Sequence, residues 1–344
     1  MSTANLDHAD LSAVDFGGLV NEDVMQRIWD ISSIPLPLSD MIGSDTCGNE
    51  YKEWTTDELA APDITNAVVD GSDAGADQSS SGARVGNHCQ ISTKVVKVST
   101  RANESNSIGN AGKLSYQIMM RQKELRRDVE AISLTQQASV ADDGNATAGE
   151  SAGLGAWLTT SDYRGAGGSA AGFANGIVAA AVVGAAQGLT ETLVRDCVQS
   201  VYEQGGDPSV FMSVPSVIRS FSEYLFTSSA RVATLTSDQG KSSEKATALG
   251  SVNVFVTDFG TLDLVDNRIQ QMHNDSGSTS VAEGYVITPS MLAHGFLHGY
   301  RTEPLAKTGL ADNRQMAVDW TLIVNTEKAH GVISEIDPTV PVVA

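Results

Sequence analysis

The chain has 344 residues, of which 41% are hydrophobic, 19% charged and 6% aromatic, enough for a substantial core in about two domains. Its 42 acidic and 22 basic side chains give a formal net charge of −20. Because affinity for nucleic acids comes largely from cations that displace counterions from phosphates, this balance disfavours a sequence-specific DNA-binding protein.

Residues 1–48 are predicted to form a mixed arm. NEDVMQRIWDI is a short amphipathic stretch, and Pro35 and Pro37 in IPLPLSD force an extended path after it. The first residues lack a basic start followed by an apolar run, so we expect no secretory signal.

Residues 49–100 are predicted to form an extended hairpin. EYKEWTTDELA is strand-like around Tyr51 and Trp54, and residues 61–86 are rich in Gly, Ser, Asp and Ala. HCQISTKVVKVST then alternates in the manner of a returning strand. A long polar excursion between two strands predicts a projection from the body that needs a partner.

The strongest helical signal covers Lys113 to Gln137. An apolar stripe recurs at spacings near 3.6 residues, through Leu114, Ile118, Leu125, Val129 and Ile132. A Gly-rich irregular connector follows over residues 140–170. The apolar run Phe173–Ala186 is predicted to be a buried or capping helix, since it is well short of the ~20 residues that span a bilayer.

The remaining chain predicts an α/β block. LTETLVRDCVQSVYEQGG reads as a helix capped by Thr190 and stopped by Gly205. SVFMSVP reads as a buried strand, SVIRSFSEYLF as a helix, and GSVNVFVTDFGTLDLVDNR as two short strands around a turn. NRQMAVDWTLIVNTEKAHGVI alternates as a long strand followed by a short return, which gives a closing strand pair.

Two motifs suggest catalysis or cofactor binding, and both lack the required context. Gly149–Gly153 matches G-x-S-x-G around Ser151, but no apolar strand precedes it and no oxyanion motif lies upstream. GAGGSA, residues 165–170, matches a dinucleotide fingerprint, yet LTTSDYR rather than a buried strand precedes it. We therefore interpret Ser151 as a loop residue and 165–170 as a flexible connector.

No metal site is predicted. His294 and His298 are four residues apart beside two glycines, with no acid or cysteine to complete a ligand set. The acidic pairs Asp142–Asp143 and Asp70–Asp73 are interpreted as solvated loop residues. The three cysteines, Cys47, Cys89 and Cys197, are scattered and odd in number, which predicts free thiols in a reducing compartment.

The order of the elements and several sequence stretches resemble the major capsid proteins of tailed bacteriophages, which have the Hong Kong bacteriophage-type capsid fold. The stretches are YKEWTTDELA, KVVKVS, RQKELRRDVEAISL, YEQGGDPSVFMSVPSVIRSFSEY and RTEPLAKTGLADNRQMAVDWTLIVNTEKAHGVI. The similarity extends from about residue 20 to residue 336, and the last stretch is the most specific.

The resemblance implies an α+β fold in five segments. They are an N-terminal arm (1–48), an extended loop (49–100), a first part of the peripheral domain with a spine helix at 113–137 and the Gly-rich connector (101–188), an axial domain (189–300), and the closing strands of the peripheral domain with the C-terminus (301–344). The founding member cross-links a loop lysine to a neighbour, but residues 63–82 contain no lysine, so we expect no such link here.

The resemblance also implies the function, which is self-assembly from hexamers and pentamers into the icosahedral head of a tailed phage. No enzymatic activity and no cofactor are expected. Portal and scaffolding proteins are expected partners, and a cement or decoration protein is an optional one. Packaged double-stranded DNA would be enclosed but not bound in a sequence-specific way. No binding to a membrane is expected. The subunit would assemble in the host bacterial cytoplasm, pass through procapsid maturation and reside in the virion.

Candidate residues for contacts between subunits come from the loop, the long helix and the closing strands. They are Trp54, Asp57, Asp63, Asp70, Asp73, Asp77, Arg84, Arg121, Arg126, Arg127 and Arg301. Three alternatives stay open: an encapsulin-like compartment shell, a head decoration protein, and an α/β hydrolase that uses Ser151.

Overall fold

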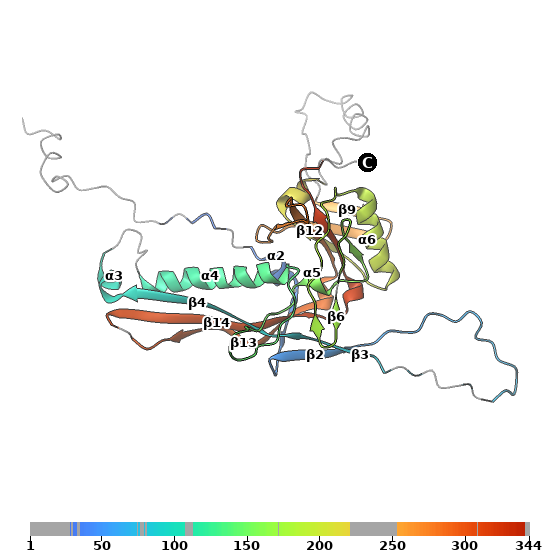
Figure 1. The fold of residues 1–344 in the computed structure, drawn as a ribbon, viewed down its shortest axis with the longest axis horizontal. Helices are drawn as coiled ribbons and strands as arrows, with labels where there is room; N and C mark the ends of the chain where they lie inside the picture. Colours follow the sequence, from blue (N-terminus) through green and yellow to red (C-terminus); the bar gives the residue numbers. More distant parts are fainter. Residues whose placement is uncertain are drawn as a thin grey trace, which may run out of the picture.

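The computed structural model describes residues 28, 30–32, 35–73, 75, 79, 81–106, 113–170, 172–220, 253–307 and 309–340. Two sheets, one long helix and a projecting hairpin make up the fold (Figure 1). The named helices are α2 (Pro37–Met41), α3 (Thr100–Glu104), α4 (Leu114–Ser133), α5 (Leu154–Trp157) and α6 (Glu191–Glu203), with 3-10 turns η2 (Pro289–Met291) and η3 (Glu327–Ala329). Residues 215–220 are also helical, as expected for SVIRSFSEYLF, and the rest of that stretch lies outside the described residues.

The first sheet is elongated and has the strand order β1-β13-β14-β4. Its members are β1 (Gly43–Thr46), β13 (Leu292–Pro304), β14 (Ala311–Val324) and β4 (Gln90–Ser99). β1 is parallel to β13, and the other neighbours are antiparallel. The register of β13 against β14 shifts between Phe296 and His298 and again between His298 and Arg301, which marks two β-bulges.

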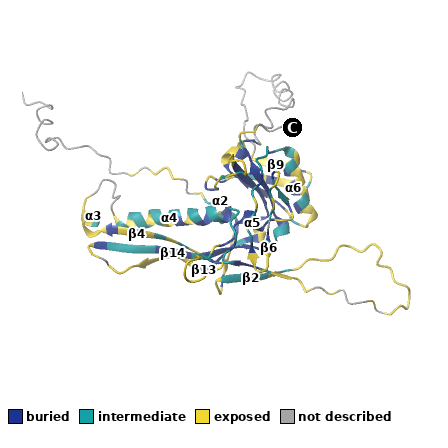
Figure 2. Ribbon diagram, viewed as in Figure 1, coloured by how far each residue is buried: buried dark blue, intermediate teal, exposed yellow. Residues whose placement is uncertain are grey.

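Helix α4 lies along this sheet, and their shared apolar residues form one core (Figure 2). Every second residue of β14 from Met316 to Leu322 is at most 1% exposed, as the period of a strand requires. These side chains join Leu125 and Val129 of α4 in the core. The expected helix is present but ends at Ser133 rather than Gln137, because Leu134 leaves helical backbone geometry.

The second sheet has seven strands and lies beside the C-terminal end of α4 (Figure 1). Its strands are β5 (Asp162–Tyr163), β15 (Gly331–Ile336), β12 (Ser280–Ile287), β8 (Val210–Ser213), β10 (Gly260–Asp266) and β9 (Val254–Thr257) in that order, with β11 (His273–Asn274) paired to β12. Helix α6 packs on it through Val194 and Val198. The predicted cap and stop of α6 are confirmed, since the Thr190 side chain accepts a hydrogen bond from the Leu193 N–H and Gly205 has a φ of +91°.

The expected closing strand pair does not form. β14 pairs with β13 and β4, whereas β15 crosses to the second sheet and pairs with β12 and β5. All six residues of β15 are buried, so it can occupy an interior position of a sheet, where no solvated face is needed. The described part of residues 301–344 therefore contributes strands to both sheets. Residues 292–300, expected in the axial domain, belong to β13 and thus to the first sheet.

The helix expected over Phe173–Ala186 is wrong. This stretch holds the hairpin of β6 (Phe173–Ala174) and β7 (Ile177–Val178), followed by extended chain with a bridge from Val182 to Ser169. Asn175 and Gly176 both have positive φ, 53° and 87°, as a tight hairpin turn of the Asn-Gly kind requires. This local turn signal outweighs the helix preference of the surrounding alanines.

The projecting hairpin is present, but its returning strand differs from the expected one. β2 (Tyr51–Thr56) pairs with β3 (Ala83–His88), and β4, which was expected to return along the hairpin, pairs with β14 instead. Thus the polar stretch 61–86 contains a strand that its composition conceals. Between β2 and β3 the chain runs far out from the body (Figure 1).

Helix α4 is tied to both the N-terminal chain and the second sheet by Glu130, which is fully buried. Its carboxyl oxygens accept hydrogen bonds from the Leu38 and Ser39 N–H groups at 2.7 and 2.8 Å, from the Ser39 hydroxyl at 2.6 Å and from Asn267 at 2.8 Å. One side chain thereby caps α2 and holds the segment after β10. None of the helices in the described ranges is long and apolar enough to cross a bilayer.

Candidate assembly surface

The base of the projecting hairpin is anchored on the body by aromatic packing. The indole of Trp54 lies 5.5 Å from that of Trp157, which stacks on Phe173 at 5.9 Å between ring centroids. Across the two strands, Arg84 pairs with Glu53, and farther out Lys328 pairs with Glu58. Trp54 and Arg84, two candidate contact residues, thus have partners within their own subunit.

Beyond this base, the loop is exposed to solvent. Every described residue from Asp57 to Gly82 is exposed. Four large apolar side chains are among them, Leu59, Ile64, Val68 and Val69, with exposed fractions of 94, 97, 83 and 79%. Residues 57–82 carry six acidic side chains and no lysine or arginine. The large apolar side chains of the loop are therefore not packed into a core. Its negative charge is not balanced by any basic residue of the loop itself.

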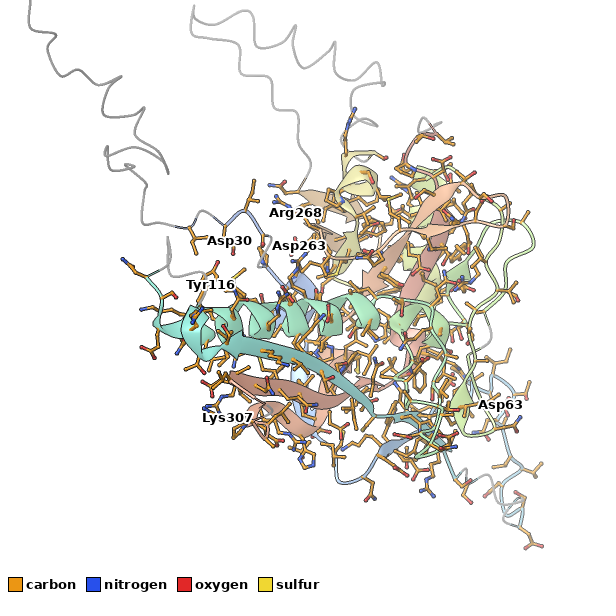
Figure 3. All side chains as sticks on the ribbon, turned by 60° about the vertical axis from the view of Figure 1, so that its left-hand side comes forward. Asp30, Asp63, Tyr116, Asp263, Arg268 and Lys307 are labelled. Carbon is orange, nitrogen blue, oxygen red and sulfur yellow. The ribbon has the colours of Figure 1, made fainter. Side chains whose placement is uncertain are left out.

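The loop carboxylates have different local roles. Asp63 accepts hydrogen bonds from the N–H and the hydroxyl of Thr65, which lower the pKa of this fully exposed carboxyl. Asp57, Asp70 and Asp73 are exposed, and Asp77 lies outside the described residues. Figure 3 shows Asp63 at one end of the molecule, with Tyr116 and Lys307 at the other.

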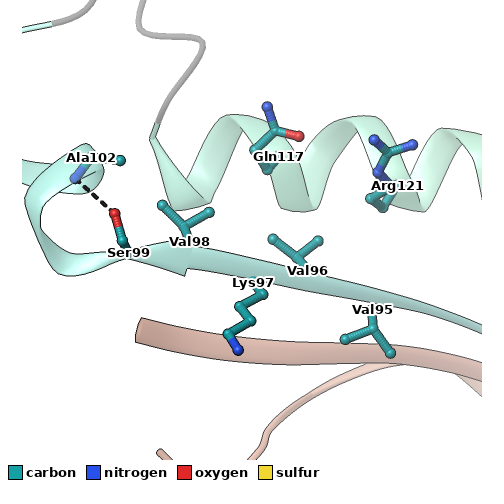
Figure 4. Close-up of a pocket in the computed structure, with 8 residues that line it drawn as sticks. All are labelled: Val95, Val96, Lys97, Val98, Ser99, Ala102, Gln117 and Arg121. Atoms are coloured by element: carbon teal, nitrogen blue, oxygen red, sulfur yellow. Dashed lines mark hydrogen bonds between the residues drawn. The ribbon is translucent and has the colours of Figure 1, made fainter. Parts of the chain in front are cut away.

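At that other end, a groove of about 400 Å³ follows the outer edge of β4. Gln117 and Arg121 of α4 line one side of it, and Val95 and Lys97 line the other (Figure 4). Val95 is 58% exposed, whereas Val96 and Val98 turn toward α4 and are buried. β4 lies at the end of the strand order, so this edge has no strand partner among the described residues. The groove offers cations, an apolar side chain and a free strand edge.

The other candidate arginines contact neighbours in their own chain. Arg126 lies over the ring of Tyr300, 5.3 Å from its centroid, and Arg301 forms an ion pair with Glu303 at 3.1 Å. Arg121 pairs with Glu124 one helical turn away. The Nε atom of Arg127 is buried without a hydrogen-bond partner among the described residues. The structure thus separates the candidates into loop acids at one end and arginines of α4 and β13 elsewhere.

Ser151 is fully buried and serves the packing of the first sheet. Its hydroxyl oxygen accepts hydrogen bonds from the Leu322 N–H at 3.1 Å and the Asn87 amide at 3.2 Å, and lies 3.3 Å from the Thr321 hydroxyl. A nucleophile must be exposed at a strand-to-helix turn, whereas this oxygen faces the backbone of β14. The interpretation as a structural loop residue agrees with this geometry.

The glycine motif at 165–170 is a packing device. A Cβ atom on Gly165 would lie 1.7 Å from the carbonyl oxygen of Ala185, so only glycine fits there. Ser169 then bridges to Val182 in extended chain, and the described residues between the motif and α6 contain no helix, although a dinucleotide site needs a helix N-terminus directly after the motif. The expectation of a flexible connector is wrong. Gly165 is closely packed against Ala185, and its N–H donates a hydrogen bond to the buried Glu335 carboxylate at 3.0 Å.

The histidine pair has a structural explanation as well. His294 is buried in β13, with Nε2 3.0 Å from the Ser133 hydroxyl, and desolvation lowers its pKa to about 4. His298 lies beyond the first bulge of the same strand, opposite Asp319. The described residues contain no group of three or more His, Cys, Asp or Glu side chains with the geometry of a metal site.

A cluster of buried acids escaped the sequence analysis. Arg164 pairs with Asp162 at 2.7 Å and with Glu335 at 3.3 Å, and Glu283 accepts hydrogen bonds from Tyr285 and Gln136. Burial raises the pKa of Glu283 to about 7 and that of Asp162 to about 6. These side chains come from β5, β12, β15 and the end of α4, so no local pattern could have revealed the cluster.

Comparisons with known proteins agree with the resemblance. The model of the SU10 major capsid protein family matches residues 4–337. A major capsid protein of Escherichia phage Phieco32 is 37% identical over 102 residues. That match covers 30% of this chain and 29% of the phage protein, so it spans less than a third of this relative's length.

Solved structures share the fold at low identity. The encapsulin SrpI of Synechococcus elongatus has a TM-score of 0.54 at 12% identity and covers 99% of both chains. The capsid of a native GTA particle has a TM-score of 0.54 at 12% identity, covering 95% of this chain and 99% of its own. A chain from Mycobacterium phage Che8 has a TM-score of 0.51 at 11% identity, covering 94% and 99%. The α+β fold of the Hong Kong bacteriophage type, expected from sequence, is therefore confirmed.

Proposed function

The chain belongs to the SU10 major capsid protein family, and we propose that it builds the icosahedral head of a tailed phage by placing its projecting loop on the β4 edge of a neighbouring copy. The family match over nearly the whole chain favours this role over an encapsulin compartment, because the encapsulin SrpI is similar to this chain only in its fold. The subunit is then a component of the virion.

The observation that carries the proposal is the loop from Asp57 to Gly82. Its four exposed apolar side chains would cost free energy in a free subunit, because each leaves apolar surface in water at roughly 25 cal/mol per Å². Fixing its backbone costs a further ~1–2 kcal/mol per residue. A loop of this composition becomes ordered when a partner surface compensates for both costs.

The β4 groove has the complementary chemistry. Lys97 and Arg121 can approach the loop carboxylates, Val95 offers apolar contact, and the free edge of β4 offers backbone N–H and C=O groups to an added strand. Loop and groove lie at opposite ends of the molecule and cannot meet within one copy (Figures 1 and 3). A patch that meets a different patch on the next copy generates a ring, as a capsomer requires.

The first test replaces residues 62–82 with a short Gly-Ser turn. We expect a folded subunit with unchanged helical circular dichroism, because the base contacts of Trp54 and Arg84 remain. Closed shells should be lost or deformed in electron micrographs, since every copy loses a neighbour contact. Normal shells from this variant would overturn the proposed docking.

The second test reverses charges. The double variant Lys97→Glu and Arg121→Glu should lower the yield of shells, and Asp63→Lys with Asp70→Lys and Asp73→Lys in the same chain should restore part of it. Arg268→Glu, an exposed arginine that follows β10 of the other sheet, is the control and should assemble normally. Equal losses in the groove variant and the control would contradict a specific loop-to-groove contact.

We further propose that α4 with the first sheet corresponds to the peripheral domain and α6 with the second sheet to the axial domain. Hexamers and pentamers would form through these bodies, with portal and scaffolding proteins as partners during assembly and a cement protein as an optional one. The net charge of −20 supports a wall that encloses double-stranded DNA without binding it. Co-purification of the particles with tagged portal protein tests the first of these contacts.

A further inference from the structure

Two of the three thiols, 42 positions apart in the sequence, lie against each other at the base of the projecting hairpin. Cys47 follows β1, and its N–H donates to the Phe296 carbonyl at 2.9 Å. Cys89 lies between β3 and β4, and its N–H donates to the Glu50 carbonyl at 2.7 Å. The Cys89 Sγ lies 3.5 Å from the Asn49 carbonyl oxygen, and the two thiols are close enough to shift each other's pKa.

This contact is built into the fold. The chain turns between Cys47 and Tyr51 so that β2 starts directly opposite His88, the residue before Cys89. A Cβ atom on Gly295 would lie 2.6 Å from the Cys47 Sγ, so the absence of a side chain on β13 leaves room for this sulfur. Both cysteines retain 8% of their surface exposed.

The surroundings make Cys47 the more reactive thiol. The neighbouring Cys89 thiol and the Lys52 ammonium lower the pKa of Cys47, while the Cys47 thiol and burial raise that of Cys89. Lys52 is fixed there by an ion pair with Asp45 at 3.0 Å and a hydrogen bond to the Thr46 carbonyl at 2.8 Å. A thiolate beside a cation and in contact with a second thiol is the arrangement that thiol–disulfide exchange requires.

We propose that Cys47 and Cys89 are a modification site that forms an intramolecular disulfide in an oxidising medium and closes a covalent ring around the projecting hairpin. The Cys47 thiolate attacks one sulfur of a small disulfide such as oxidised glutathione, forming a mixed disulfide and releasing one small thiol. Cys89 loses its proton and attacks the Cys47 sulfur, which releases the second small thiol. Two protein thiols are thus oxidised to one disulfide, and the small disulfide is reduced.

The third cysteine is a natural control. Cys197 lies on α6 in the second core, is fully buried, and desolvation raises its pKa. It should stay reduced under conditions that oxidise the pair. The expectation from sequence that all three thiols are free describes the reduced chain, in which the structure has all three unpaired.

The test incubates the full chain with oxidised glutathione under native conditions and then counts thiols after denaturation. We expect the count to fall from three to one, with a mass loss of two hydrogen atoms and no glutathione adduct. Cys89→Ala should instead keep a glutathione adduct on Cys47, whereas Cys197→Ala should still close the ring. Three thiols remaining in the wild-type chain would overturn the proposal.

A second measurement locates the bond without relying on variants. Limited digestion with a Glu-specific protease cuts the oxidised chain after Glu58, in the exposed loop, and the two fragments that meet at this bond are identified by mass. We expect the two fragments to stay joined on a non-reducing gel, to separate after reduction, and to stay joined also in Cys197→Ala. Separation without reductant would contradict the ring. Neither readout requires shells, so failure of this proposal and failure of the docking proposal are distinguishable.

Discussion

The projecting loop and strand β12 contain similar apolar residues, but the loop exposes them and β12 buries them. Seven consecutive residues of β12, from Val281 to Ile287, are buried between neighbouring strands, whereas every described residue from Asp57 to Gly82 is exposed. β12 obtains its stability within the subunit, whereas we propose that the loop obtains it from a neighbouring copy. Changes in the body should therefore lower the free energy of unfolding, and changes in the loop should lower assembly alone.

The largest effect on unfolding is expected for Glu130→Ala. The variant leaves the N–H groups of Leu38 and Ser39 and the amide of Asn267 without their acceptor, at ~1–3 kcal/mol for each buried group. We expect a loss of about 3–5 kcal/mol in urea unfolding. Glu124→Ala, a partly exposed acid on the same helix that pairs only with Arg121 among the described residues, should cost under about 0.5 kcal/mol. Equal losses at both positions would contradict the role of Glu130 in holding α4 to the N-terminal chain and the second sheet.

The second effect concerns pH and Glu283. Burial raises its pKa from 4.5 to about 7, so between these values the folded chain binds a proton that the unfolded chain has released. Stability is therefore greatest below pH 4.5 for this group and falls as pH rises to 7, at about 1.4 kcal/mol per pH unit. Asp162, raised to about 6, acts in the same direction.

Glu283→Gln should flatten this dependence, which urea unfolding between pH 5 and pH 8 measures. The amide has no proton to lose, and the unpaired Oε1 atom of Gln136 can accept a hydrogen bond from it. Glu303→Gln, an exposed acid on β13, is the control and should leave the slope unchanged. A pH profile of Glu283→Gln as steep as that of the wild type would assign the dependence to other groups.

A smaller effect is expected for Ser151→Ala. The variant removes the acceptor of the Leu322 N–H and a partner of Asn87, which should cost about 1–2 kcal/mol in urea unfolding. Ser81→Ala, in the exposed loop, should cost nothing measurable. Hydrolysis of a chromogenic ester by the wild type, lost in Ser151→Ala, would contradict the structural interpretation of this serine.

The smallest effect on unfolding is expected in the loop itself. Val68→Ser should change the free energy of unfolding by less than about 0.5 kcal/mol, because Val68 is 83% exposed in the subunit. The same substitution at Val286 in β12 should cost about 2–3 kcal/mol, since that side chain is fully buried. Shell yield should nevertheless fall for Val68→Ser. Unchanged yield would weaken the case for an apolar docking contact.

Sequence patterns predicted the elements whose signals are local. The stripe on α4, the Thr190 cap of α6 and the alternation along β14 each depend on residues close together in the chain. The hairpin at Asn175–Gly176 was missed because the composition of a long alanine-rich run was weighed above a two-residue turn signal. β3 was missed because its sequence, ARVGNH, does not alternate clearly between apolar and polar residues.

The candidate site was predictable only in part. The projecting loop follows from composition, but the groove along β4 depends on α4 leaving that edge open, which no single segment encodes. The contact of Cys47 with Cys89 and the four bonds of Glu130 join residues that the fold alone brings together. Long-range pairing of this kind is invisible to periodicity and propensity.

The two bulges in β13 have a consequence for how the chain avoids uncontrolled polymerisation. β1 covers the outer side of β13 only from Ala293 to Phe296, so the rest of this long strand is a bare edge among the described residues. Both register shifts fall just beyond that point, and the strand ends at Pro304, which has no N–H to donate. Each bulge twists the strand and breaks the even spacing of donors and acceptors that a second sheet would need. β4, by contrast, pairs with β14 through ten residues without a shift, so the irregular side of the sheet is a poorer template for an added strand than the regular side.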